Sequence, residues 1–230
     1  MKTAVRMIAP LAMLLFGVAS AFAQTEYRFE IFAAAGVPLD KDFLLGLPQA
    51  SPLVNGTFDF SPGVRGGVRF GADFKKYWGE DFIYSYGYNF SKIRSSAAEG
   101  QFAIPTRSHQ FAINALWYPG GVVRNAKVTP YLTAGVGGTF FTTTSKTFNA
   151  AKEAGLGELR TENVFAFNAG GGLRMRLGDH FGLRLDGRDY MSRVPRFGMP
   201  EKSEDPNALV FPASGVFHNL EASIALVFYF

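Results

Sequence analysis

In several segments of this chain of 230 residues, apolar residues occupy every second position. The charged side chains fall on the positions between them. Between Val64 and Phe74, for example, Arg65, Arg69 and Asp73 alternate with apolar residues or glycine. The same pattern includes Arg28, Glu30, Arg65, Arg69, Asp73, Arg174, Arg176, Arg184, Asp186, Arg188 and Glu221. Arginines and carboxylates gathered on one face can pair with each other, or they can line a path for ions.

Eight alternating segments position these residues. Successive side chains of a β-strand point to opposite sides, so strict alternation predicts strands with one polar and one apolar face. A tilted strand crosses a membrane with about 9–11 residues, and most of the segments are close to that length. They cover residues 27–35, 63–74, 82–90, 109–118, 131–140, 165–177, 181–188 and 220–230.

The connections between these segments alternate in length. Two are short (75–81 and 178–180), one is intermediate (119–129), and four are long (36–62, 91–108, 142–163 and 192–216). An even strand number with short links at one end and long loops at the other is typical of outer-membrane barrels. We therefore predict an all-β fold over residues 24–230, a closed eight-stranded antiparallel up-and-down transmembrane β-barrel with four long extracellular loops.

The N-terminus predicts export. Lys2 and Arg6 precede an apolar run, and Ala21-Phe22-Ala23 forms a small-x-small cleavage site, so residues 1–23 are predicted to be a cleaved signal peptide. We expect the product in the outer membrane of a Gram-negative-type bacterium. Removal of Lys2 and Arg6 lowers the formal net charge from +4 to +2, which is too small to suggest a nucleic-acid partner. The chain has no cysteine, which excludes disulfides and thiolate metal sites.

Alternation alone would also fit a soluble barrel such as a lipocalin, which has the same period with the opposite polarity. The polar face combines arginine and aspartate with small residues, which suits a narrow polar interior. Aromatic residues stand near both ends of the apolar faces, as two interfacial girdles would require. They are Tyr27, Phe74, Phe82, Phe90, Trp117, Phe181, Phe228 and Phe230. The sequence therefore favours a membrane barrel, with outer-membrane lipids as its surroundings.

Three stretches carry a family resemblance: Pro130-Tyr-Leu-Thr-Ala-Gly-Val-Gly137, Phe181-Gly-Leu-Arg-Leu-Asp186, and the terminal Phe230. With them the chain resembles the small eight-stranded outer-membrane proteins of the OmpA-like group. The resemblance implies that the barrel-assembly machinery recognises the C-terminal strand through an insertion signal that contains Phe228 and Phe230. We expect no peptidoglycan-binding domain, because the sequence ends with that strand.

An eight-stranded barrel is only wide enough for its own side chains, and buried charges are costly unless they are paired. We predict the ion pairs Arg188–Glu221 and Glu30–Arg69 in a lumen of seven arginines and four carboxylates. The expected function is structural or surface-interacting and non-enzymatic, with the long loops as the candidate site for a surface ligand. The alternative is a narrow, weakly anion-preferring channel for small solutes.

Three outward positions, His109, Asp189 and His218, raise a further alternative, because histidine with a carboxylate and a serine can hydrolyse esters. His109 and His218 belong to strands on opposite sides of the predicted ring. Asp189 and His218 have no serine two residues along, the nearest being Ser192 and Ser214. An outer-membrane lipid hydrolase is thus the remote alternative, and we expect no catalytic residue, cofactor or metal.

The first long connection is unusually apolar. It contains Phe43, Leu44, Leu45, Leu47, Leu53 and Val54. A freely solvated loop would contain fewer apolar residues. We expect this connection either to fold over the mouth of the barrel as a lid or to form a contact surface.

Deletion of Phe230 should sharply reduce assembly into the outer membrane and leave export intact, because the terminal aromatic belongs to the predicted insertion signal. The measurement is the amount of heat-modifiable, membrane-inserted protein on gels. Unchanged amounts in the deletion strain would remove the insertion role from this strand.

Overall fold

The computed structural model describes residues 25–39, 42–45, 56–74, 76–95, 101–122, 127–143, 160–205 and 210–230. The predicted signal peptide lies outside them. The described elements are β1 (Thr25–Pro38), β2 (Asp42–Leu45), β3 (Gly56–Phe74), β4 (Trp78–Ser95), β5 (Gln101–Trp117), β6 (Val128–Thr143), β7 (Glu162–Arg176), β8 (Phe181–Arg193) and β9 (Val216–Tyr229). Within these residues, no helix is long and apolar enough to cross a membrane.

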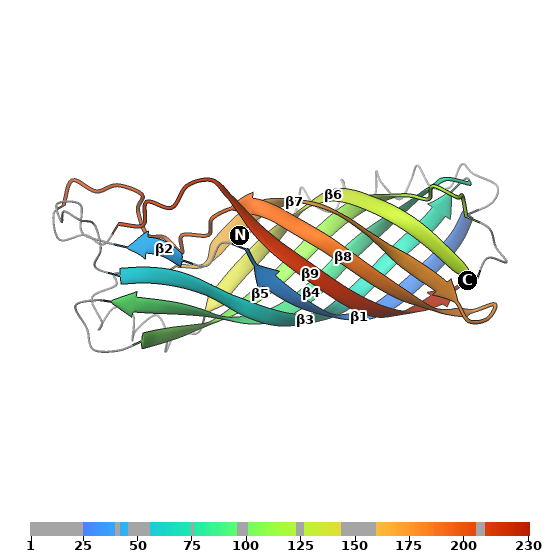
Figure 1. Cartoon of the computed structure of the whole chain (residues 1–230), viewed down its shortest axis with the longest axis horizontal. Coiled ribbons are helices and arrows are strands. Elements are labelled where there is room, and N and C mark those ends of the chain that lie inside the picture. Colours follow the sequence, from blue (N-terminus) through green and yellow to red (C-terminus); the bar gives the residue numbers. More distant parts are fainter. Residues whose placement is uncertain are drawn as a thin grey trace, which may run out of the picture.

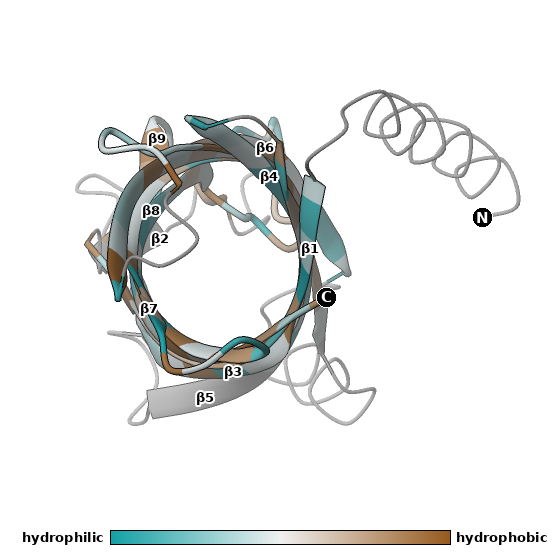
Figure 2. Cartoon of the chain, turned by 90° about the vertical axis from the view of Figure 1, so that its right-hand side faces the viewer, coloured by the Kyte–Doolittle hydropathy of each residue, from teal (hydrophilic) through white to brown (hydrophobic). Residues whose placement is uncertain are grey.

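The eight long strands close into a barrel. Each pairs antiparallel with its neighbour in the order β1-β9-β8-β7-β6-β5-β4-β3, and β1 then pairs with β3 from Thr25↔Phe74 to Gly36↔Gly63. The closed ring is visible end-on in Figure 2. The closed eight-stranded antiparallel barrel predicted from the alternation is confirmed. Because every long strand has two partners, no long edge of unpaired backbone groups is left.

The two ends of the barrel differ. The C-terminus lies at the same end as the short β7–β8 turn, and the opposite end carries β2 and the extensions of β3 and β4 (Figure 1). We call these the C-terminal end and the loop end. The two links predicted to be short, β3–β4 and β7–β8, both lie at the C-terminal end.

Several strands are longer than the alternation predicts. β4 runs on to Ser95 and β5 begins at Gln101, and the two pair from Trp78↔Trp117 to Arg94↔Gln101. The second long connection, expected over 91–108, is therefore mostly paired strand. The predicted strands ended at Phe90 and began again at His109, but backbone pairing beyond the apolar band depends less on an apolar face.

The first connection also contains more structure than expected. β2 pairs with the start of β3, from Asp42↔Asp59 to Leu45↔Gly56. This hairpin extends the wall of the barrel at the loop end. Leu47, Leu53 and Val54 lie outside the described residues.

The two faces of each strand have the predicted polarity. On β9, Ile224 and Leu226 are exposed on the outside, whereas Glu221, Ala225 and Val227 are buried inside. Exposed aromatic residues stand on the outer surface near the C-terminal end and again nearer the loop end: Tyr27, Trp78, Trp117, Phe181 and Phe230, then Tyr86, Tyr88, Phe140 and Phe165. Two such belts suit the two interfaces of a bilayer.

Cysteines introduced at Ile224 and Leu226 should react with a lipid-phase maleimide, and cysteines at Ala225 and Val227 should be protected. The chain has no native cysteine, so each variant carries a single reporter. Leu226→Arg should also destabilise the barrel by about 2–4 kcal/mol if it lies near the midplane of the membrane. The opposite labelling pattern would mean that the register of β9 is wrong by one residue.

Candidate functional site

The candidate site is the charge network inside the barrel. The structure places all eleven charged residues expected in the lumen on the inward face. Nine of them are almost fully buried: Arg28, Glu30, Arg69, Asp73, Arg174, Arg184, Asp186, Arg188 and Glu221. The Arg65 side chain is 8% exposed and that of Arg176, at the C-terminal mouth, 16%. Near-complete burial of this many charges requires close mutual pairing.

Arg184 on β8 is the centre of the network. Its Nη1 lies 2.9 Å from Glu30 Oε1 on β1 and 3.0 Å from Asp81 Oδ2 on β4. Its Nη2 lies 3.0 Å from Asp186 Oδ2, and its Nε donates to the Tyr131 hydroxyl at 2.7 Å. The guanidinium also lies 4.5 Å from the centroid of the Tyr131 ring. One arginine thereby uses every nitrogen of its guanidinium with partners from four strands.

These contacts cross the lumen. β4 and β8 lie four strands apart in the ring of eight, on opposite walls, and so do β3 and β7. The Arg184–Asp81 pair joins the first two walls, and Arg174 Nη2 joins the second two at 2.6 Å from Asp73 Oδ2. Ion pairs at hydrogen-bond distance between opposite walls fill the cross-section of the barrel at these levels.

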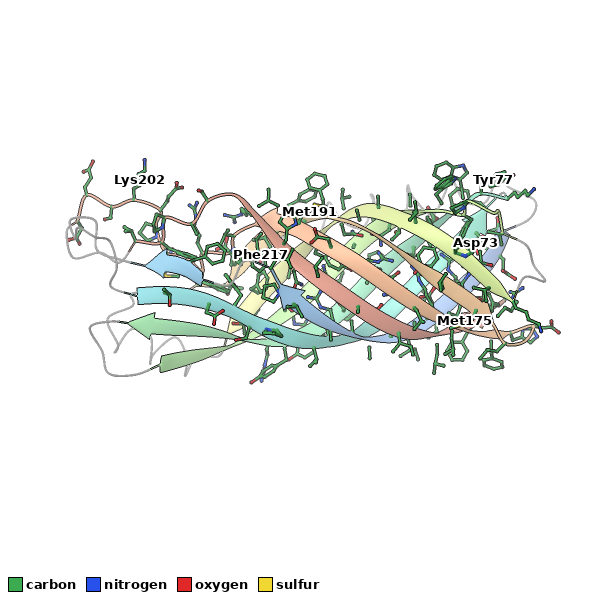
Figure 3. The ribbon with its side chains drawn as sticks, viewed as in Figure 1. Asp73, Tyr77, Met175, Met191, Lys202 and Phe217 are labelled. Carbon is green, nitrogen blue, oxygen red and sulfur yellow. The ribbon has the colours of Figure 1, made fainter. Side chains whose placement is uncertain are left out.

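Asp73 organises a second layer closer to the C-terminal end, where Figure 3 shows it near the end marked by Tyr77 and Met175. Its carboxylate accepts hydrogen bonds from Arg28, Arg174 and the Tyr118 hydroxyl, the last at 2.5 Å. Tyr118 follows the last residue of β5, and its side chain is fully buried beside Asp73.

Of the two predicted ion pairs, the structure contains one. Glu30 Oε2 lies 3.4 Å from Arg69 Nη1, and Arg69 also donates to Ser223 Oγ at 2.9 Å. Arg188 and Glu221 are opposite each other in the β8–β9 register, but their side chains do not pair, and that prediction was wrong.

Both residues of the failed pair have other partners. Arg188 Nε lies 2.6 Å from Asp186 Oδ1 and its Nη2 3.6 Å from Asp81. Glu221 Oε2 lies 3.0 Å from Arg65 Nε, an ion pair by distance whose angle is too poor for a hydrogen bond. An arginine side chain is long enough to extend across a narrow lumen. The Cα register of two strands therefore does not fix which carboxylate an arginine pairs with.

Two carboxylates in the lumen were missed. Asp81 is fully buried and forms ion pairs with Arg184 and Arg188. Its Oδ1 also accepts a 2.6 Å hydrogen bond from the Asn114 amide. Glu26 lies 2.5 Å from Arg176 at the C-terminal mouth. Asp81 continues the inward parity of Ile83 and Ser85, which could have identified it, but it was assigned to the turn. The seven arginines thus face six carboxylates, an excess of one positive charge where the sequence suggested three.

Inward glycines provide space for these large side chains. A Cβ on Gly71 would stand 2.5 Å from Arg28 Nη2, and a Cβ on Gly172 would stand 2.4 Å from the Tyr131 hydroxyl. Neither side chain could keep its place beside an alanine at these positions. The glycines of the polar face are thus part of the network.

Aromatic residues form a cluster at the loop end. The Phe60 ring lies 4.9 Å from Phe217 and 5.8 Å from Phe43, and Phe43 lies 5.9 Å from Phe211, centroid to centroid. Phe197, from the segment after β8, packs at 6.5 Å from Phe60 and is buried. The Phe43 part of the apolar first connection therefore packs against the start of β3 and β9 and the segment before β9, and its role as a lid or a contact surface stays a prediction. We call Phe43, Phe60, Phe197, Phe211 and Phe217 the aromatic cap.

A cavity of about 40 Å³ lies between the network and the aromatic cap. Arg65, Gln110 and Tyr190 line it on one side, and Phe60 and Phe217 on the other. Its volume exceeds the about 10–15 Å³ that a single water needs. It is a pocket with room for a few waters.

The outward titratable residues lie in two separate places on the barrel wall. His218 Nδ1 and Asp189 Oδ2 lie 2.6 Å apart, whereas His109 lies on β5 with its Nδ1 3.0 Å from the Tyr84 hydroxyl. The Ser192 hydroxyl donates to the carbonyl of Arg193. Among the residues that the structure describes, no group of three His, Asp or Glu side chains is placed to hold a metal ion.

The predicted insertion residues lie at the C-terminal end of the seam between β9 and its neighbours. Phe230 N and O bond to Tyr27 O and N at 3.1 and 3.2 Å, and the Phe228 ring packs 5.5 Å from Phe181. The side chain of Phe230 stays exposed on the outside. Its role in insertion stays a prediction.

The barrel resembles solved outer-membrane barrels. No family model matches the chain, and no curated protein matches it in sequence. The crystal structure of the outer membrane protein OprG from Pseudomonas aeruginosa superimposes with a TM-score of 0.65 and 13% sequence identity, over 91% of this chain and 97% of that one. Neisserial surface protein A covers 90% of this chain and 99% of its own at 11% identity, with a TM-score of 0.48.

At these identities the comparison establishes the fold alone. The chain has the fold of the small eight-stranded outer-membrane β-barrels, as its resemblance to that group implied.

Replacing Arg184 with leucine should destabilise the barrel by about 3–5 kcal/mol, because Glu30, Asp81 and Asp186 would lose a shared buried partner. The matched control is Arg196→Leu, whose pair with Glu201 is partly exposed and should be worth at most about 1 kcal/mol. Equilibrium unfolding followed by the fluorescence of Trp78 and Trp117 measures both. Equal losses in the two variants would contradict a buried network.

Proposed function

We propose that this chain is a non-enzymatic outer-membrane barrel with a sealed lumen, which serves envelope structure or surface interaction and does not conduct solutes. The observation that carries the proposal is the Arg184–Asp81 contact between opposite walls. A path for solutes through that level would require both side chains to leave fully buried positions. Separating a buried pair costs several kcal/mol, so an open state would be rarely populated.

Two further features support a sealed interior. The Asp73 layer forms a second barrier closer to the C-terminal end, and the aromatic cap lies at the loop end. The outer surface carries an apolar band between two aromatic belts, which suits a barrel held in a membrane with its loop end outside. With the lumen filled, the surfaces left for function are the lipid-facing wall and the loops.

The rival candidate is the narrow, weakly anion-preferring channel. The single excess positive charge and the water-sized cavity beside Arg65 would favour it. The cavity is lined by Arg65 but not by Arg184 or Asp81, so a channel would need the network to open.

Planar-bilayer recording decides between the two. Wild-type protein should show no steady current, whereas the variant Arg184→Ala/Asp81→Ala/Arg174→Ala/Asp73→Ala should show openings, since it removes both contacts between opposite walls. Arg196→Ala is the control for a charge change outside the lumen. Steady anion-selective current through the wild-type protein would overturn the sealed-lumen proposal in favour of the channel.

A further inference from the structure

The outward pair Asp189 and His218 has no part in sealing the lumen, because it lies on the outer wall of the barrel. The two side chains lie on the lipid-facing side of β8 and β9, 25% and 36% exposed, and make a 2.6 Å contact between Oδ2 and Nδ1. Ionisable groups on the lipid face of a barrel are destabilising, and an ionisable residue inside a membrane is a functional-site candidate by default.

The surroundings of the pair are apolar and aromatic. The register places His218 beside Met191, and Met191 beside Phe167; Figure 3 labels Met191 in this row. Asp189 lies beside Leu220, which is exposed. Phe167 and Phe165 are also exposed, with ring centroids 5.1 Å apart. Aromatic rings of this kind mark the level of the headgroups at a membrane interface.

A second cation stands one step closer to the loop end. Arg193 lies two residues beyond Met191 on β8, opposite Val216, and its side chain is 59% exposed. Arg193 is therefore the diagonal neighbour of His218 on the adjacent strand. The Cα atoms of such neighbours lie about 7–8 Å apart. Its Nη2 contacts Glu162 and donates to the Asn163 carbonyl at 3.1 Å, which holds the guanidinium at the rim.

The contact geometry leaves one donor site on the imidazole. Because the carboxylate engages Nδ1, it orients the ring, and among the described residues no hydrogen bond to Nε2 is formed. Nε2 can donate to a phosphate oxygen when the ring is protonated, and it can accept from a P–OH group when it is not. Asp189 Oδ1 is enclosed and has no partner among the described residues, so the carboxylate acts toward the imidazole alone.

We propose that His218, oriented by Asp189, and Arg193 bind the phosphate of an outer-leaflet lipid headgroup. The pair of donors matches a phosphate group, for which guanidinium and imidazolium groups form charge-assisted hydrogen bonds. A lipid fits better than a free phosphate ion because the apolar side chains flanking the site, exposed Leu220 and Phe167 and half-buried Met191, offer an apolar wall for acyl chains. The assignment rests on the membrane location proposed above but not on a sealed lumen.

The test uses the full protein in phosphatidylcholine nanodiscs doped with bisphosphorylated lipid A, followed by gentle extraction and native mass spectrometry. Wild-type protein should retain the phosphorylated lipid, and His218→Gln or Arg193→Gln should each reduce retention by about tenfold, the loss expected for one charge-assisted hydrogen bond. The matched control is His109→Gln, an outward histidine bound to Tyr84, which should retain lipid as wild type does.

Two further arms need no variant. Lipid A without its phosphates should be retained no better than phosphatidylcholine, and inorganic phosphate should fail to shift the imidazole NMR signals of His218 that phosphorylated lipid A shifts. Equal retention of both forms of lipid A, unchanged retention in the folded His218→Gln protein, or saturation by inorganic phosphate alone would each overturn the lipid assignment. Folding is checked by heat-modifiability, and the bilayer recordings test the lumen separately.

Discussion

The structure depends on one constraint: the guanidinium of Arg184 is fully buried in the middle of a barrel too narrow to hydrate it. An isolated buried charge is prohibitively costly, so its neighbours must be carboxylates or hydroxyls at bonding distance. Glu30, Asp81 and Asp186 supply them from three strands. Each carboxylate in turn needs more than one cation, which brings Arg28, Arg69 and Arg188 into the same layer.

The charge network also restricts which residues can stand beside it on the inward face. Large inward side chains fit only because glycine occupies Gly71 and Gly172, where a Cβ would collide with Arg28 or Tyr131. Tyr131 makes two kinds of contact with Arg184: its ring lies under the guanidinium, and its hydroxyl accepts a hydrogen bond from Nε. Contacts between opposite walls also fix the cross-section of the barrel, so the same bonds that compensate the charges hold the eight strands at a constant separation.

The sequence predicted the barrel well because its signal is local. Alternation over 63–74 or 220–230 sets which residues face inward, and the structure follows that parity for every charged residue named in the lumen. Strand ends were less predictable. Asp81 and the stretch from Ser91 to Ser108 were read as turn or loop, because charged and hydroxyl residues serve equally in a turn, in a polar lumen and in a strand beyond the membrane.

Pairing inside the lumen was predictable only in part. Glu30 and Arg69 are direct neighbours in the β1–β3 register and do pair, but Arg188 and Glu221, also neighbours, turn to Asp186 and Arg65. Partners on opposite walls, such as Arg184 and Asp81, have no signature in the sequence, since their proximity comes from closure of the ring. The aromatic cap has the same origin, because it joins residues of β2, β3, β9 and the segment after β8.

Solvent exchange of the arginine Nε protons tests the central claim most directly. In ¹⁵N-labelled protein refolded into a bilayer mimetic, NMR can follow the Nε–H signal of each arginine separately. The account predicts that Arg184 Nε–H, bonded to Tyr131 in a sealed interior, exchanges with water much more slowly than Arg176 Nε–H at the open C-terminal mouth. Equal and rapid exchange of both protons would show that water passes through the lumen and would contradict a barrel closed by its own ion pairs.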